Sequence, residues 1–175
     1  MLLAFFTVFF LGCTTLNPLI PKTTFESGYT EIIELEKQYN LTNMNEIETY
    51  TIYLDNFKSK LDPTTRDISA LNQFLEFRIN LLTAQKNILF AEHELGLGIN
   101  CSEQQNALEG FAYLKDANKN LELTVVSLNK FRSIYPEYVA KTKITDQTTT
   151  DLQTIILEST KALNDFRTEY NALCG

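Results

Sequence analysis

Apolar residues that recur at alternating spacings of three and four constrain the fold of this chain more than any other feature. Residues 63–95 carry two adjacent lines of this kind, Ile68, Leu75, Leu82, Leu89 and Phe74, Leu81, Ile88, Leu95. Together the lines give a helix one broad apolar face, which needs more than one neighbouring helix to cover it. Sustained heptads favour near-parallel packing at a crossing angle of about 20°. The pattern therefore predicts an all-α fold, an elongated antiparallel helical bundle.

The heptad pattern continues in two more long segments, residues 103–135 and 150–173. The first carries the seam Ala107, Phe111, Leu114, Asn118, Leu121, Val125, Leu128, and the second carries Leu152, Ile156, Ser159, Leu163, Phe166, Tyr170, Leu173. Asn118 is the polar exception in its seam. A buried Asn either fixes the register of a helix, at some cost in stability, or marks a ligand contact. We favour the first interpretation.

Capping residues and helix breakers divide the chain into about five helices. A short amphipathic helix is expected at residues 25–39, and Asn43 followed by Glu46 indicates a second helix start of the capping-box kind. Asp62-Pro63 ends the second helix and supplies an N-cap and first-turn signal for the third. The remaining boundary signals are Gly96-Leu97-Gly98, Ser102 with Gln105, Pro136 and a polar connection at 141–149.

The composition agrees with long helices and argues against one class of partner. The 175 residues include only 6 Gly and 4 Pro, and 44% of them are hydrophobic. This is enough for a single helical domain with its own core, which we place at residues 25–175. The net charge of -7 argues against nucleic acid, because binding to phosphates needs clustered Lys and Arg, and the sequence has no such cluster.

An almost unbroken apolar run opens the chain, from Leu2 to Leu11. As a helix it would extend roughly 15 Å, about half of the hydrocarbon thickness of a bilayer, so it suits a signal peptide better than a membrane span. The end of the run, Phe10-Leu11-Gly12-Cys13, resembles the lipobox of the prokaryotic membrane lipoprotein class. An uncleaved signal anchor, or an ordinary signal peptide cut elsewhere, is the alternative interpretation.

The resemblance to lipoproteins implies a location for the protein. Residues 1–12 would be a removable signal peptide, and Cys13 would carry two acyl chains, which anchor stably at about 0.8 kcal/mol per buried CH₂. Residues 13–24 would form a short tether. The mature protein is therefore expected outside the cytoplasm, held to a prokaryotic membrane by its N-terminal lipid.

The other two cysteines, Cys101 and Cys174, are expected to form a disulfide. Helix 103–135 would run roughly 48 Å away from Cys101, and helix 150–173 would return by roughly 36 Å. An up-down-up arrangement therefore brings the two residues to one end of the bundle, within the Cα separation of about 5 to 6 Å that a bridge needs. An exported domain can keep such a bridge. Two unpaired thiols at the same end are the alternative.

The sequence offers few residues for a catalytic or metal site. The single histidine, His93, is interpreted as a solvated residue, because its acidic neighbours Glu92 and Glu94 point in other directions around a helix. No phosphate loop, nucleotide fingerprint, nucleophile elbow or Cys-x-x-Cys is present. We therefore predict no catalytic residue, no metal and no cofactor. Asn40 and Asn100 begin glycosylation tripeptides, of which Asn40 is the better acceptor.

Two functions remain after these exclusions. The first is a lipid-anchored, non-enzymatic module that presents a bundle surface to a protein or polymer of the cell envelope. The second is a carrier that holds a small or apolar ligand between its helices, which the broad apolar face of helix 63–95 would permit. A cavity of several hundred Å³ between the helices would favour the carrier. A dense core with an exposed apolar patch would favour the interaction module.

Overall fold

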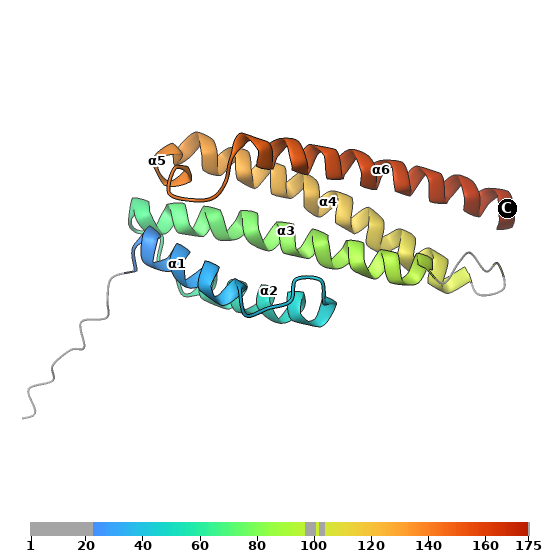
Figure 1. The fold of residues 1–175 in the computed structure, drawn as a ribbon, viewed down its shortest axis with the longest axis horizontal. Coiled ribbons are helices and arrows are strands. Elements are labelled where there is room, and N and C mark those ends of the chain that lie inside the picture. Colours follow the sequence, from blue (N-terminus) through green and yellow to red (C-terminus); the bar gives the residue numbers. More distant parts are fainter. Residues whose placement is uncertain (1–22, 97–100, 102–103, 175) are drawn as a thin grey trace, which may run out of the picture.

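The computed structural model describes residues 23–96, 101 and 104–174, and within them it contains helices and no strand. The helices are α1 (Phe25–Glu36), α2 (Met44–Ser59), α3 (Arg66–Gly96), α4 (Gln104–Ile134), α5 (Pro136–Val139) and α6 (Asp146–Cys174). Figure 1 shows the three long helices stacked side by side, with α4 between α3 and α6 and with α1 and α2 against the first part of α3. The predicted all-α, elongated antiparallel bundle is confirmed.

The helices differ in how closely they pack. α3 and α4 form the central antiparallel pair, and α2 covers one side of α3. α6 packs against α4, whereas α3 and α6 make little direct contact. The side of the bundle between α3 and α6 is therefore open beyond the end of α1. This opening forms the candidate site described below.

The predicted start of the second helix holds in part. Asn43 caps α2, since its Oδ1 accepts from the backbone N–H groups of Asn45 and Glu46. The Glu46 carboxylate reaches back to the N–H of Asn40, 2.6 Å away, and not to that of Asn43 as a capping box requires. The start of α1 has a complete capping box between Thr24 and Ser27, which the sequence analysis did not anticipate.

The predicted start of α3 at Asp62-Pro63 is wrong. The helix begins at Arg66, and Thr65 acts as its cap, because its Oγ1 accepts from the N–H of Ile68 and its carbonyl accepts from the N–H of Ser69. The Ser69 hydroxyl also donates to the carbonyl of Pro63, 3.1 Å away. The turn formed by these bonds delays the helix by three residues.

The polar connection predicted at residues 141–149 is also partly wrong. The short helix α5 precedes it, and α6 begins at Asp146 within it. The Arg132 side chain on α4 holds the first turn of α6, donating to the carbonyl of Thr145 and to the hydroxyl of Thr149. Thr145 and Thr148 also contribute locally, because the Thr145 N–H donates to Thr148 Oγ1, 3.0 Å away, and the interpretation of residues 141–149 missed this signal.

Aromatic rings form the core where α1 meets α3, α4 and α5. Phe25 is fully buried, and its ring centroid lies 4.8 to 6.4 Å from those of Tyr29, Phe74, Phe131 and Tyr138. Gly28 allows α1 to approach α3 closely, since a Cβ at this position would lie 2.3 Å from Leu71 Cδ2. Gly28 is therefore a packing residue of the contact between α1 and α3.

The buried face of α4 differs from the seam predicted for it. Its buried residues step by three and four through Ala107, Gly110, Leu114, Ala117, Leu121, Thr124, Leu128 and Phe131. Phe111, Asn118 and Val125 from the predicted seam are only partly buried. Phe111 packs against Phe166 of α6, and Asn118 contacts Thr160 of the same helix. The predicted seam therefore mixes residues of the α3 interface with residues of the α6 interface.

Candidate functional site: an open groove between three helices

An open groove of about 340 Å³ lies between α3 and α6 and has α4 as its floor. Its walls are almost entirely apolar, and Leu114 contributes from α4. Glu92 of α3 and Glu158 of α6 are the acidic residues that line it. The complete lining is Ile88, Ala91, Glu92, Leu95, Leu114, Ile155, Glu158, Ser159 and Ala162. A groove of this shape suits an elongated apolar surface with basic groups at its edges.

Two polar atoms near the groove are buried without a hydrogen-bond partner among the described residues. Ser159 lines the groove and is 8% exposed, and its Oγ has no partner. Asn118 Oδ1 is the second such atom. The Asn118 amide nitrogen donates to Thr160 Oγ1, 3.3 Å away, while the amide oxygen has no partner among the described residues. Both residues belong to the contact between α4 and α6.

Replacing Asn118 with leucine should therefore stabilise the protein. The change removes a buried acceptor that has no partner, and it lets a leucine fill the α4–α6 contact. After subtraction of the lost hydrogen bond to Thr160, we expect the free energy of unfolding to rise by about 1 kcal/mol. Chemical denaturation of the variant measures it. Asn129→Leu on the exposed side of α4 is the matched control and should change stability little. A fall in stability for Asn118→Leu would show that the Thr160 bond outweighs the unpaired acceptor.

One exposed edge of α6 borders the groove and is strongly acidic. We call this edge the acidic strip; its members are spaced by three and four, all are exposed, and they are Asp151, Ile155, Glu158, Ala162, Asp165, Glu169 and Leu173. It contains four carboxylates and no basic residue. Of the four, only Asp165 takes part in an ion pair within the described chain, with Lys161 at 3.6 Å. The acidic strip is a negatively charged border with little internal compensation.

Sequence reasoning missed the acidic strip although its spacing was available. The interpretation of residues 150–173 used only the more apolar line through Leu152 and Ser159, which faces α4. The line through Ile155 and Ala162 has the same period and holds acids in place of leucines. Only the position of α3 relative to α6 shows that this second line borders an open groove.

A buried ionic cluster lies on the other side of α3 and has a structural role. Arg78 binds both carboxylate oxygens of Glu36, at 2.6 and 2.8 Å, and the Tyr50 hydroxyl donates to the carbonyl of Ile32, 3.0 Å away. Burial of the Tyr50 hydroxyl raises the pKa of Tyr50 well above its usual value, and the negative charge of Glu36 raises it further. Tyr50 therefore stays protonated, and the cluster joins α1, α2 and α3.

His93, the single histidine, is exposed near the end of α3. It borders a shallow hollow with Leu89, Glu92 and the turn before α2. Within residues 23–96, 101 and 104–174, no three His, Cys, Asp or Glu side chains gather closely enough to hold a metal ion. This arrangement gives His93 no partner group for acid–base or metal chemistry among the described residues.

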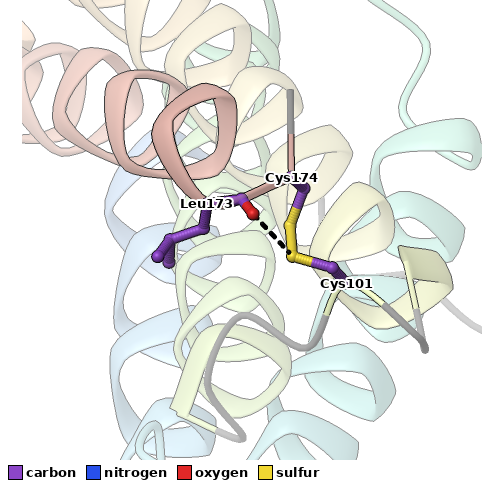
Figure 2. The surroundings of a disulfide bond; sticks show 3 residues. All are labelled: Cys101, Leu173 and Cys174. Carbon is purple, nitrogen blue, oxygen red and sulfur yellow. Dashed lines mark hydrogen bonds between the residues drawn. A yellow bond between two sulfur atoms is a disulfide. The ribbon is translucent and has the colours of Figure 1, made fainter.

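The predicted pair Cys101 and Cys174 is joined as a disulfide, shown in Figure 2. The two Cα atoms lie 5.4 Å apart, and 73 positions separate the residues in the sequence. Cys101 Sγ also lies 3.3 Å from the carbonyl oxygen of Leu173, the dashed line in Figure 2. A disulfide sulfur carries no hydrogen, so this approach would be a hydrogen bond only in the reduced protein. The bridge ties the last turn of α6 to the chain just before α4.

The other predicted modification sites are only partly covered by the structure. Asn40 is exposed in the turn after α1, where its Oδ1 accepts from the Thr42 hydroxyl, 2.7 Å away. Asn100, Cys13 and the lipobox-like residues lie outside the described residues. Among the described helices, none combines the length and hydrophobicity that crossing a membrane requires.

Comparison with protein-family models, with curated proteins and with solved structures gives no match to this chain. The function of this chain is therefore inferred from the groove and the acidic strip.

Proposed function

We propose that this protein is a lipid-anchored, extracytoplasmic interaction module, without catalytic activity, that binds a protein of the cell envelope. The observation that carries the proposal is the open apolar groove between α3 and α6 with the acidic strip along its edge. Apolar grooves between helices are a common way to bind an amphipathic helix. Exposed apolar surface next to charged residues is typical of binding sites.

An anchor at Cys13 would hold this groove away from the membrane surface. Phe25, the first residue of α1, follows Cys13 by 12 positions, a reach of at most about 40 Å. In Figure 1, α1 starts at the end of the bundle that carries α5, and α6 ends at the opposite end. The groove residues of α3 and α6 therefore lie towards the end of the bundle that is remote from the anchored segment.

Intact mass spectrometry of the protein from the membrane fraction tests the anchor. The expected product is a mature chain that begins at Cys13 and carries added acyl mass. Cys13→Ser is the control and should leave the chain unacylated and abolish its membrane retention. A chain that keeps Met1, or a soluble product cut elsewhere, would contradict the anchor and leave the groove proposal standing.

Site-specific photocrosslinking in the producing cell tests the groove. A photoreactive amino acid at Ala162, which lines the groove, should yield adducts with a protein. The same probe at Leu157, which is 71% exposed on another face of α6, is the matched control and should yield few. Equal yields at the two positions, or none at either, would contradict a binding function for the groove.

A carrier for a small apolar ligand is the second candidate, because two observations favour it. The volume of the groove falls within the usual range for ligand sites, and the unpaired Ser159 Oγ could bind a polar group of the ligand. Native mass spectrometry of protein purified from its host should then show a bound compound. Ser159→Val should reduce the bound fraction without lowering protein adducts at Ala162. Absence of any bound compound would exclude the carrier.

A further inference from the structure

A second exposed strip, on α4, carries the opposite charge. We call it the lysine strip; its members are spaced by three and four, all are exposed, and they are Leu108, Ala112, Lys115, Lys119, Leu123, Val126, Lys130 and Ile134. It holds three lysines and no acid. Its four large apolar side chains are 42% to 62% exposed. None of its lysines joins an ion pair with another described residue.

The lysine strip and the acidic strip match in composition and in length. Both carry apolar residues and charges of a single sign along one line of a long helix, and Asp116 and Glu122 flank the lysine strip, each three residues from Lys119. At 1.5 Å per residue, the lysine strip extends about 39 Å and the acidic strip about 33 Å. Opposite charges along matched helix faces steer association and fix its register. Helix α4 therefore carries, on its lysine strip, the apolar and basic residues that would suit the groove and its acidic strip.

We propose that the partner of the groove is a second copy of this chain, whose lysine strip docks against the acidic strip and the neighbouring wall of α3. This inference rests on the proposed function, because it names the occupant of the same groove. In the docked pair, Lys115, Lys119 and Lys130 lie beside the carboxylates of the acidic strip. The apolar members of the two strips cover each other, and Glu92 faces the docked helix from α3.

The pairing is head-to-tail and weak. Except for Leu108, which lines a small hollow with Phe166 and Tyr170 of α6, the lysine strip lies on the side of α4 away from α3 and α6. The acidic strip borders the groove, so each contact uses one strip from each copy and leaves the other strip of each copy free. A contact about 33 Å long and one helix, about 10 Å, wide covers roughly 700 Å² in total, below the roughly 1,000 Å² expected of a stable interface. Copies anchored to one surface would associate more readily, because anchoring raises their effective concentration.

Carbodiimide cross-linking tests the pairing directly, because the reagent joins a lysine amine to a carboxylate that it touches. Full-length protein, purified from its host in mild detergent at low salt, is mixed in equal amounts with heavy-nitrogen-labelled protein. Peptide pairs of mixed isotope are then intermolecular. The expected pairs join Lys115, Lys119 or Lys130 to residues of the acidic strip. At about 1 M salt, where the Debye length falls to about 3 Å, their yield should fall sharply.

Charge reversal separates the two sides of the contact. Lys115, Lys119 and Lys130 all changed to Glu give one variant, and Asp151, Glu158 and Glu169 all changed to Lys give the other. Each variant alone lacks one of the two reacting groups at these positions and so cannot form the expected pairs, and only their mixture reports on docking. The second variant has lysines on both strips and the first has carboxylates on both, so a mixture of the two should recover them. Helical content and melting temperature report whether both remain folded.

Several outcomes would overturn the inference. Mixed-isotope pairs that are absent from the wild-type mixture, that join other residues, or that the mixture of the two variants does not recover would each do so. If these pairs are absent while the Ala162 probe yields adducts with a different protein, the second copy is the wrong partner and the proposed function stands. If neither experiment gives adducts, the proposed function fails as well.

Discussion

Changing both Cys101 and Cys174 to serine should lower the free energy of unfolding by about 4 kcal/mol. The bridge closes a segment with a sequence separation of 73, and in the chain-entropy model a loop of this length contributes about that much. The effect should be concentrated in α6. Only Leu152 and Ser159 of this helix are buried, so its last turns depend on the bridge for their attachment to the rest of the bundle.

Denaturant unfolding of the double serine variant, with hydrogen exchange, measures the effect. Exchange should rise in α6 near Cys174 and change little in α1 and α2. Wild-type protein with an added reductant is the matched control, and its unfolding should coincide with that of the variant. A loss well below 1 kcal/mol would show that α6 is held by its contact with α4 alone.

Phe25→Ala should cost about 3 to 5 kcal/mol, the usual range for truncating a fully buried phenylalanine. The ring is 0% exposed and packs against aromatic residues of α3, α4 and α5. Removing it leaves a cavity where these elements meet, and it loosens α1 at its first residue. Hydrogen exchange should therefore rise throughout α1 before global unfolding.

The control for this variant is Leu157→Ala, since Leu157 is 71% exposed and should change stability by less than about 0.5 kcal/mol. Thermal and denaturant unfolding of both variants give the comparison. If Phe25→Ala lowered the free energy of unfolding as little as the control does, α1 would not belong to the cooperative core. The arrangement of α1 against α3 would then need to be reconsidered.

These two expectations describe a bundle that is held differently at its two ends. Near α5, the Phe25 cluster supplies dense apolar packing among four helices. At the far end, α3, α4 and α6 form an incomplete group with a groove, and the disulfide replaces part of the missing packing. The open end therefore has exposed surface available for binding, which agrees with the proposed function.

Much of the fold could be predicted because helices are specified by local spacing. The long helices appear within a few residues of their predicted positions, and Asn43 caps α2 as expected, because periodicity and caps act over four residues or fewer. The cysteine pair also followed from helix lengths alone. A local turn capped by Thr65 moved the start of α3, whereas Arg132 of another helix holds the start of α6 inside a segment interpreted as a connection.

The candidate site could not be found from the sequence in the same way. Two lines with heptad spacing run along residues 150–173, and the sequence does not say which of them faces a neighbour. The more apolar line, through Leu152, holds the two buried residues of α6, Leu152 and Ser159. The line through Ile155 became part of a groove only because α3 and α6 both pack on α4 without closing on each other.

By itself the sequence determined the helices, their approximate lengths, their antiparallel order and the meeting of Cys101 with Cys174. These depend on spacing along the chain, where the geometry of a helix is fixed at 1.5 Å per residue. Only the tertiary structure decided which faces are covered, because burial depends on the angle between neighbouring helices as well as on period. The packing of α3 and α6 on α4 leaves the α3–α6 side open with the acidic strip along its edge, and the lysine strip is exposed on another side of α4.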